Sequence, residues 1–216
     1  MRLIDMVEAK EMLAAEGFPV IPSYVVNSWD ELRDKAMEYS YPVVLKFVSN
    51  RYTHKSDVGG VITNIRSEEE LKEALEQLEV LRNRLDPKAR IVLEPMAPSG
   101  IELFAGFMRD DHFGPVMTFG IGGLFVELMG EVQFVLLPAS NIDILNMCRK
   151  IRGWDKLQRG FRKFAPVDES MLVNFLQKFG EWTLAKRYVK EVDLNPVVAY
   201  ANGIMVVDAR ISVLQQ

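Results

Sequence analysis

The pattern of the sequence changes near residues 94–100, and this change indicates a fold of two parts. Before it, helical apolar stripes alternate with short apolar runs that predict strands. After it, short apolar runs alternate with glycines, which is typical of a mostly antiparallel sheet. We therefore expect two lobes, a smaller one over about residues 20–96 and a larger one over about residues 1–19 plus 97–216. Lobes of this kind commonly leave a crevice between them for a ligand.

Capping signals and periodicity predict the elements of the first part. Ser28 and Ser67 each begin a capping box, and a leucine stripe follows Ser67 at helical spacing. A first helix is predicted over residues 3–16, where Gly17 ends it. The prolines of residues 19–26 remove ladder donors, so we expect an edge strand there. Further strands are predicted over residues 43–48, 59–66 and 90–94.

The second part predicts a sheet with two helices. Its apolar runs predict strands over residues 101–108, 115–119, 124–128 and 132–138. Helical spacing predicts helices over residues 141–152 and 168–188. The chain then ends in a predicted hairpin of residues 191–200 and 204–213, joined through Asn202-Gly203.

Charge and composition exclude several classes of protein. A net charge of −4 argues against a general nucleic-acid binder, which needs a basic face. No uninterrupted run of about 20 apolar residues is present, so we expect no membrane span. The single cysteine, Cys148, forms no internal disulfide, and the first residues lack the apolar stretch of a signal peptide. The expected location is the cytoplasm.

The terminal hairpin predicts a polar face that could hold a metal ion. A two-residue turn places Asn195 opposite Arg210, and alternation then puts Asp193, Asn195, Asp208 and Arg210 on one face. Asn195 and Asp208 become diagonal neighbours, roughly 7–8 Å apart at Cα. Oxygen ligands at this separation suit Mg²⁺, which needs few protein ligands beside phosphates and water. The alternative is a sheet with one apolar and one wet face, and a bulge at Pro196 would change the register.

A lysine lies inside an apolar strand of the first part. Lys46 stands within Val-Val-Leu-Lys-Phe-Val, so its ammonium group must reach water or meet an anion. A phosphate group would serve as that anion. The alternative is an exposed position on a half-buried strand.

One of the two histidines lies among groups that suit an anion. His54 is followed by Lys55 and Ser56 and then by the paired glycines Gly59 and Gly60. Imidazole is a nucleophile near neutral pH, and a neighbouring cation helps it to accept a phosphoryl group. The alternative is an ordinary histidine on a surface loop.

The glycine-rich segment 119–123 matches neither of the common nucleotide motifs. It lacks the spacing of the dinucleotide fingerprint, and no Gly-Lys-Ser/Thr follows it as in a Walker loop. Its glycines permit either close backbone approach to a ligand or a tight turn.

Six segments, taken in order, resemble one known family. They are residues 44–46, 54–61, 100–102, 113–127, 193–196 and 207–211. Together they resemble the ATP-grasp domain of ADP-forming (NDP-forming) acetyl-CoA synthetases, relatives of the succinyl-CoA synthetase β subunit. His-Lys-Ser-Asp-Val-Gly-Gly followed by Asp-x-Asn-Pro is specific to that group. The resemblance spans nearly the whole chain and implies an α+β ATP-grasp fold, with two α/β lobes and a nucleotide cleft between them.

The resemblance also implies roles for particular residues. Lys46 would contact the phosphates of ATP or ADP, and His54 would carry the phosphoryl group between sites. Asn195 and Asp208 would hold Mg²⁺. Glu94 and Met96 would belong to the hinge segment that holds adenine and ribose, and Glu102 would also face the nucleotide. The paired glycines Gly59 and Gly60 are further nucleotide-binding candidates.

The implied reaction needs a second subunit or domain. Acyl-CoA, ADP and phosphate would give acid, CoA and ATP, reversibly, and a partner α subunit or domain would bind CoA. We therefore expect a hetero-oligomer. Pro95, Val135 and Lys163 depart from the family pattern, which keeps open a nucleotide-binding regulatory or structural domain without phosphoryl transfer. A carboxylate–amine ligase is a third alternative, but it would need no histidine at position 54.

Overall fold

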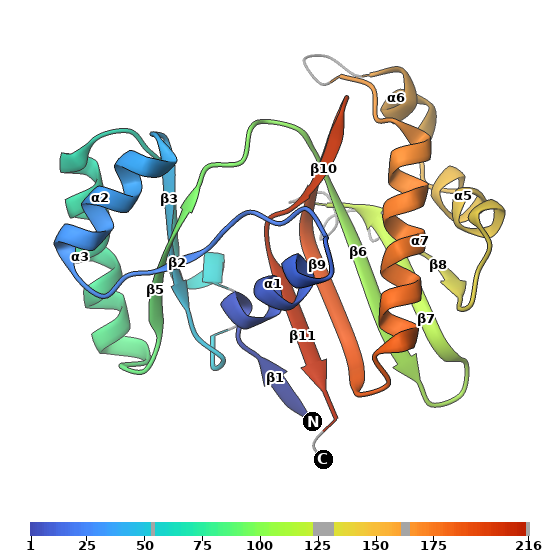
Figure 1. Cartoon of the computed structure of the whole chain (residues 1–216), viewed down its shortest axis with the longest axis horizontal. Coiled ribbons are helices and arrows are strands. Elements are labelled where there is room, and N and C mark those ends of the chain that lie inside the picture. Colours follow the sequence, from blue (N-terminus) through green and yellow to red (C-terminus); the bar gives the residue numbers. More distant parts are fainter. Residues whose placement is uncertain (53–54, 123–131, 161–164, 215–216) are drawn as a thin grey trace. The chain divides into compact units, whose positions relative to one another are not determined.

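The computed structural model describes residues 1–52, 55–122, 132–160 and 165–214. The chain divides into two compact units (Figure 1). Unit 1 combines Met1–Val20 with Ser99–Gln216, and unit 2 is Ile21–Pro98. None of the helices in the described ranges combines the length and the apolar composition that a membrane crossing requires.

Unit 2 is a four-stranded antiparallel sheet with two helices packed on one face (Figure 1). The strand order is β2-β5-β3-β4, so β2 is an edge strand as the prolines predict. The elements in chain order are β2 (Tyr24–Val25), α2 (Trp29–Tyr39), β3 (Val43–Val48), η1 (Lys55–Val58), β4 (Val61–Ile65), α3 (Glu68–Leu85) and β5 (Arg90–Pro95).

The predicted caps begin both helices of unit 2. Ser28 Oγ accepts a hydrogen bond from Glu31 N at 3.3 Å, and Ser67 Oγ accepts one from Glu70 N at 3.2 Å. The inward faces of both helices pack on one side of β3 and β5, where burial of apolar surface stabilises the unit. The other face of the same two strands carries Lys46.

Unit 1 contains the second sheet, with order β1-β11-β9-β6-β7-β8 and β10 paired to β9. Every pairing between its strands is antiparallel, as predicted. Its elements are β1 (Arg2–Ile4), α1 (Met6–Ala15), β6 (Ile101–Asp110), β7 (Gly114–Ile121), β8 (Val132–Leu136), α5 (Asn141–Arg149), α6 (Trp154–Arg159), α7 (Glu169–Ala185), β9 (Val189–Tyr200), β10 (Gly203–Val206) and β11 (Ala209–Val213).

The first helix is shorter than predicted because the first residues form a strand. Asp5 is the N-cap of α1, and its side chain accepts a hydrogen bond from Val7 N at 2.8 Å. The preceding residues pair with β11, with Ile4 opposite Ile211. The short helix α6 was not predicted, and the strand predicted over residues 124–128 lies outside the described residues.

The predicted register of the terminal hairpin is wrong by two residues. Tyr200 pairs with Gly203, so the turn is Ala201-Asn202 and not Asn202-Gly203. Arg210 consequently lies opposite Asp193 and not opposite Asn195. The predicted shared face is unaffected, because a shift of two residues preserves the alternation of side chains.

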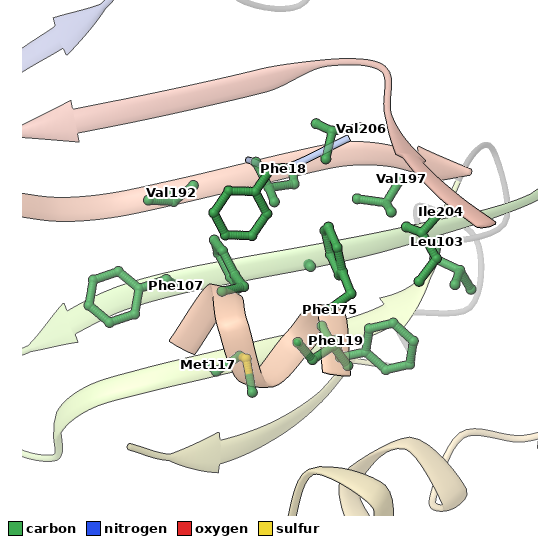
Figure 2. Packing of buried hydrophobic residues seen from close by; sticks show 14 of the residues in the cluster. Phe18, Leu103, Phe107, Met117, Phe119, Phe175, Val192, Val197, Ile204 and Val206 are labelled. Carbon is green, nitrogen blue, oxygen red and sulfur yellow. The ribbon is translucent and has the colours of Figure 1, made fainter. Parts of the chain in front are cut away.

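A bulge in β9 moves the core-facing positions along the strand. On β6, Leu103 lies opposite Val197 while Ala105 lies opposite Leu194, so β9 has one more residue than β6 across this step. Val192 and Leu194 face the core before the bulge, and Val197 faces it afterwards. Figure 2 shows Val192 and Val197 among the same cluster of buried side chains.

Candidate functional site

The predicted strand lysine of unit 2 is buried in a chain of three polar groups. Lys46 Nζ lies 2.6 Å from Glu94 Oε2, and the side chains are only 6% and 1% exposed. The other carboxylate oxygen, Glu94 Oε1, accepts a hydrogen bond from Ser23 Oγ at 2.6 Å. The alternative of an exposed lysine is therefore wrong. Glu94 also affects Tyr39 of α2. Burial is the main cause of the raised pKa of the Tyr39 hydroxyl group, and the negative charge of Glu94 raises that pKa as well.

The sheet brings these two charged groups together. Lys46 lies opposite Val92, and Glu94 lies opposite Val44, so the lysine and the glutamate are diagonal neighbours on β3 and β5. Diagonal neighbours on one face are within reach of long side chains. The opposite face of both strands packs in the apolar core, which holds the two backbones rigidly.

The segment after Glu94 leaves the sheet at Pro95 and Met96. Pro95 is the last residue of β5 and lies opposite Val43. Met96 N donates a hydrogen bond to Pro42 O at 3.2 Å, and the residue is 36% exposed. Proline supplies no N–H at position 95, so the end of β5 has no backbone donor at this residue.

The paired glycines form a tight turn that precedes β4. Gly59 has a φ of +71°, a conformation that favours glycine. Gly60 N donates to Lys55 O at 2.7 Å, and its carbonyl accepts from Phe47 N at 2.7 Å. A Cβ at Gly60 would lie 2.9 Å from Lys55 O, so the close approach requires glycine. His54, the predicted phosphate carrier, lies outside the described residues.

In unit 1, the register of the terminal hairpin brings Asn195 and Asp208 together on the non-core face. Asn195 N donates a hydrogen bond to Asp208 O at 3.2 Å, so the two residues are opposite one another and not diagonal. The Asp208 carboxylate accepts a hydrogen bond from Ala209 N at 2.9 Å. Asn195 is exposed and Asp208 is partly exposed.

The donor set at Asn195 and Asp208 fits a magnesium ion. The amide oxygen lies on β9 and the carboxylate lies between β10 and β11, and both are the hard ligands that Mg²⁺ accepts, with water and phosphate completing its shell. Within the described ranges, no three His, Cys, Asp or Glu residues gather as a metal-binding group. The fit is therefore to a sparse site that shares its ion with a ligand.

Glu102 lies near one end of β6 on the same non-core face. It is exposed, and its partner across the strands is Val198. Its carbonyl accepts a hydrogen bond from Gly122 N at 2.7 Å, which fixes the glycine-rich segment to the start of β6. A Cβ at Gly122 would lie 2.7 Å from Leu103 O, so at this glycine the close approach is to the chain's own backbone.

The sequence did not predict two residues that contact the candidate site, Lys10 beside Asp208 and Ser23 beside Glu94. Lys10 is only 3% exposed, and its Nζ donates to Val207 O at 3.2 Å, next to Asp208. The signal for Lys10 was present, because it lies four residues after Met6 on the apolar face of its helix. Ser23 carried no such signal, since its contact with Glu94 depends on the order of strands in the sheet.

Comparison with known proteins identifies the class of fold. A family model described as ATP-grasp domain matches residues 1–213. The chain therefore belongs to the ATP-grasp domain family, in the branch of the ADP-forming acetyl-CoA synthetases.

Individual relatives give the particular resemblance. The chain is 38% identical over 206 residues to acetate–CoA ligase (ADP-forming) I subunit beta of Pyrococcus furiosus, covering 94% of this chain and 88% of the relative. Other relatives are longer single chains, of which this chain covers 30%.

Two solved structures of the dinucleotide forming acetyl-coenzyme A synthetase 1 of Ca. Korarchaeum cryptofilum also match. One, with coenzyme A, Ca-AMPCP and HgCl⁺, has a TM-score of 0.91 and 40% identity, covering 99% of this chain and 94% of that chain. The other holds coenzyme A and Mg-AMPPCP, with its phosphohistidine segment pointing towards the nucleotide binding site. It has a TM-score of 0.80 and 40% identity over 97% of this chain and 92% of that chain.

Proposed function

We propose that this chain is the nucleotide-binding subunit of an ADP-forming acyl-CoA synthetase of the acetate–CoA type. It would transfer a phosphoryl group between a phosphohistidine and ADP or ATP. The observation that carries the proposal is the similarity to a subunit beta of this enzyme class along almost the whole chain. The buried cation of unit 2 and the oxygen pair of unit 1 support it.

The proposed chemistry assigns separate tasks to the two units. In unit 2, Lys46 binds the nucleotide phosphates through a charge-assisted contact. The segment containing Glu94 and Met96 holds adenine and ribose. In unit 1, Asn195 and Asp208 would hold Mg²⁺, and Glu102 faces the nucleotide. The metal ion, when bound, offsets negative charge on the phosphates during transfer.

The proposed carrier is His54, with Gly59 and Gly60 in the same segment. In the ATP-forming direction, the phosphorus–nitrogen bond of phosphohistidine breaks while a phosphorus–oxygen bond forms to the terminal phosphate of ADP. The imidazole nitrogen keeps the electron pair of the broken bond. A covalent carrier protects the phosphoryl group from water between two distant sites.

The proposed partner is a CoA-binding α subunit, which would make the acyl phosphate. The relative from Pyrococcus furiosus is named subunit beta, which supports an assembly of unlike subunits. We further propose that units 1 and 2 are the larger and smaller lobes of one ATP-grasp domain.

Phosphohistidine labelling tests this function. The chain is incubated with radiolabelled ATP, Mg²⁺ and its cognate CoA-binding partner. We expect an acid-labile, base-stable label that is lost in His54→Ala and retained in His112→Ala, the control at the second histidine of the chain. A label that persists in His54→Ala would remove His54 from the mechanism. A nucleotide-binding domain without phosphoryl transfer would give no label in any variant.

A further inference from the structure

The contacts of Glu94 differ from those of a residue that reads adenine or ribose. Each of its carboxylate oxygens already has a donor at 2.6 Å, Ser23 Oγ on one and Lys46 Nζ on the other. The Glu94 side chain is 1% exposed and presents almost no surface that a ligand could touch, whereas the Lys46 side chain is 6% exposed and is the more accessible member of the pair. A carboxylate oxygen can accept a second hydrogen bond, so it is the burial of this side chain that argues against contact with an adenine amine or a ribose hydroxyl.

The same contacts suit a group that acts through its neighbour. A buried ammonium group is costly unless it is paired and hydrogen-bonded, and a buried carboxylate has the same requirement. Glu94 satisfies Lys46, and Ser23 satisfies the remaining oxygen of Glu94. An ammonium group donates in three directions, so an ion pair with Glu94 is compatible with a contact to phosphate.

We propose that Glu94 is a positioning residue that holds Lys46 in place for the nucleotide phosphates, with Ser23 holding Glu94 in turn. The carboxylate then contributes to affinity for the phosphates and not for adenine or ribose, which are held by the backbone after β5. This inference rests on the proposed function only in that Lys46 meets a phosphate group.

The sheet explains why the Lys46–Glu94 ion pair keeps a fixed orientation. Lys46 and Glu94 stand on paired strands whose reverse face lies in the apolar core of unit 2. Their backbones therefore cannot shift without disrupting that packing. A lysine side chain alone has many rotamers, and an ion pair with a fixed carboxylate removes much of that freedom before the ligand arrives.

Binding of adenosine and ADP to matched variants tests the inference. Affinities of the full chain are measured by ligand-observed NMR for adenosine and by calorimetry for ADP. We expect Glu94→Gln to weaken ADP binding by about tenfold or more, as for a lost charge-assisted contact, while adenosine affinity changes by less than about twofold. Lys46→Met should give the same selective loss.

Four further variants guard against a trivial loss of folding. Ser23→Ala should produce a smaller selective loss for ADP, and Ser23→Thr, which keeps the hydroxyl, should restore most of it. The double variant Lys46→Met/Glu94→Gln removes both charges and should bind ADP no more weakly than Lys46→Met alone. Glu76→Gln, an exposed position on α3, is the matched control and should bind both ligands as the wild type does.

Several results would overturn the inference. One is an equal loss of adenosine and ADP affinity in Glu94→Gln, which would place the carboxylate on adenine or ribose or give it a purely structural role. Another is a further loss of ADP affinity when Glu94→Gln is added to Lys46→Met. A wild-type chain that binds neither ligand would remove the proposed function and this inference together.

Discussion

Arg109 joins three parts of unit 1, and its replacement should lower the stability of the protein. Its guanidinium group donates to Val189 O at 2.8 Å from Nε, and to Thr183 O at 2.8 Å from Nη2. Nη2 also lies 3.4 Å from Lys186 O. These carbonyls lie at the end of α7 and the start of β9. The guanidinium group therefore ties the end of β6 to a helix end that attracts positive charge.

The size of the effect follows from these contacts. Hydrogen bonds to a charged group contribute about 1.5–3 kcal/mol each, and a cation at a helix C-terminus contributes about 0.3–1 kcal/mol. The two short bonds share one side chain and are not fully additive, and the third is too long to add much. Arg109→Met should therefore lower the free energy of unfolding by about 2–4 kcal/mol. Arg109→Lys, which keeps the charge but not the fork, should lose about half as much.

Urea unfolding followed by tryptophan fluorescence and circular dichroism measures this change. Arg33→Met is a suitable control, because Arg33 makes solvent-exposed contacts with Asp34 and should not alter the midpoint measurably. If Arg109→Met unfolds with the wild-type midpoint, the Arg109 guanidinium group does not stabilise the protein at the end of α7. Wild-type stability in Arg109→Lys would show that charge alone, without the fork geometry, is sufficient.

Four further predictions concern single sites. Lys46→Ala should weaken nucleotide binding by about 1.5–3 kcal/mol in calorimetry, and unchanged binding would refute its contact with phosphate. Burial raises the pKa of the Cys148 thiol to about 12, so a thiol reagent at pH 8 should modify it only after unfolding; rapid reaction in the native protein would contradict this. Hydrogen bonds from Ser170 and from backbone N–H groups at the start of α7 lower the pKa of Asp168, so its contribution to stability should be present at neutral pH and be lost as pH falls from about 4 through the lower folded pKa. Comparison of the acid-unfolding profile with that of Asp168→Asn measures this, and identical profiles would refute it. A Cβ at Gly106 would collide with Thr118 Oγ1, so Gly106→Ala should lower the free energy of unfolding by about 1–3 kcal/mol. Adding Thr118→Ala should recover part of this loss. Strictly additive effects of the two substitutions would contradict the collision.

The elements that could be predicted were those whose signals are local. Ser28 and Ser67 begin helices because a hydroxyl three residues before an N–H is a short-range arrangement. The antiparallel sheet after residue 100 followed from short apolar runs separated by turn residues. The first helix was overextended because two of the residues predicted for it, Leu3 and Ile4, instead pair with β11, near the other end of the chain.

The features that could not be predicted depend on contacts between distant segments. Lys46 was expected to need an anion, but nothing in its neighbourhood identified Glu94 as a partner, because their proximity comes from the pairing of β3 with β5. The hairpin register failed for a related reason. Turn chemistry favoured Asn202-Gly203, whereas the pairings along β9, β10 and β11 place the turn one residue earlier. The possible bulge at Pro196 was foreseen, but its consequence for which side chains face the core was not.

The bulge in β9 also allows one strand to supply side chains both to the core and to the opposite face of the sheet. Val192, Leu194 and Val197 all serve the interior, while Asn195 is placed outside it. The side chains of Asn195 and of Asp208 opposite it can therefore be replaced by others with little disturbance of the packing in the core of unit 1. Such an arrangement lets selection change the proposed metal site on this face, or abolish it, while leaving the scaffold of the subunit intact.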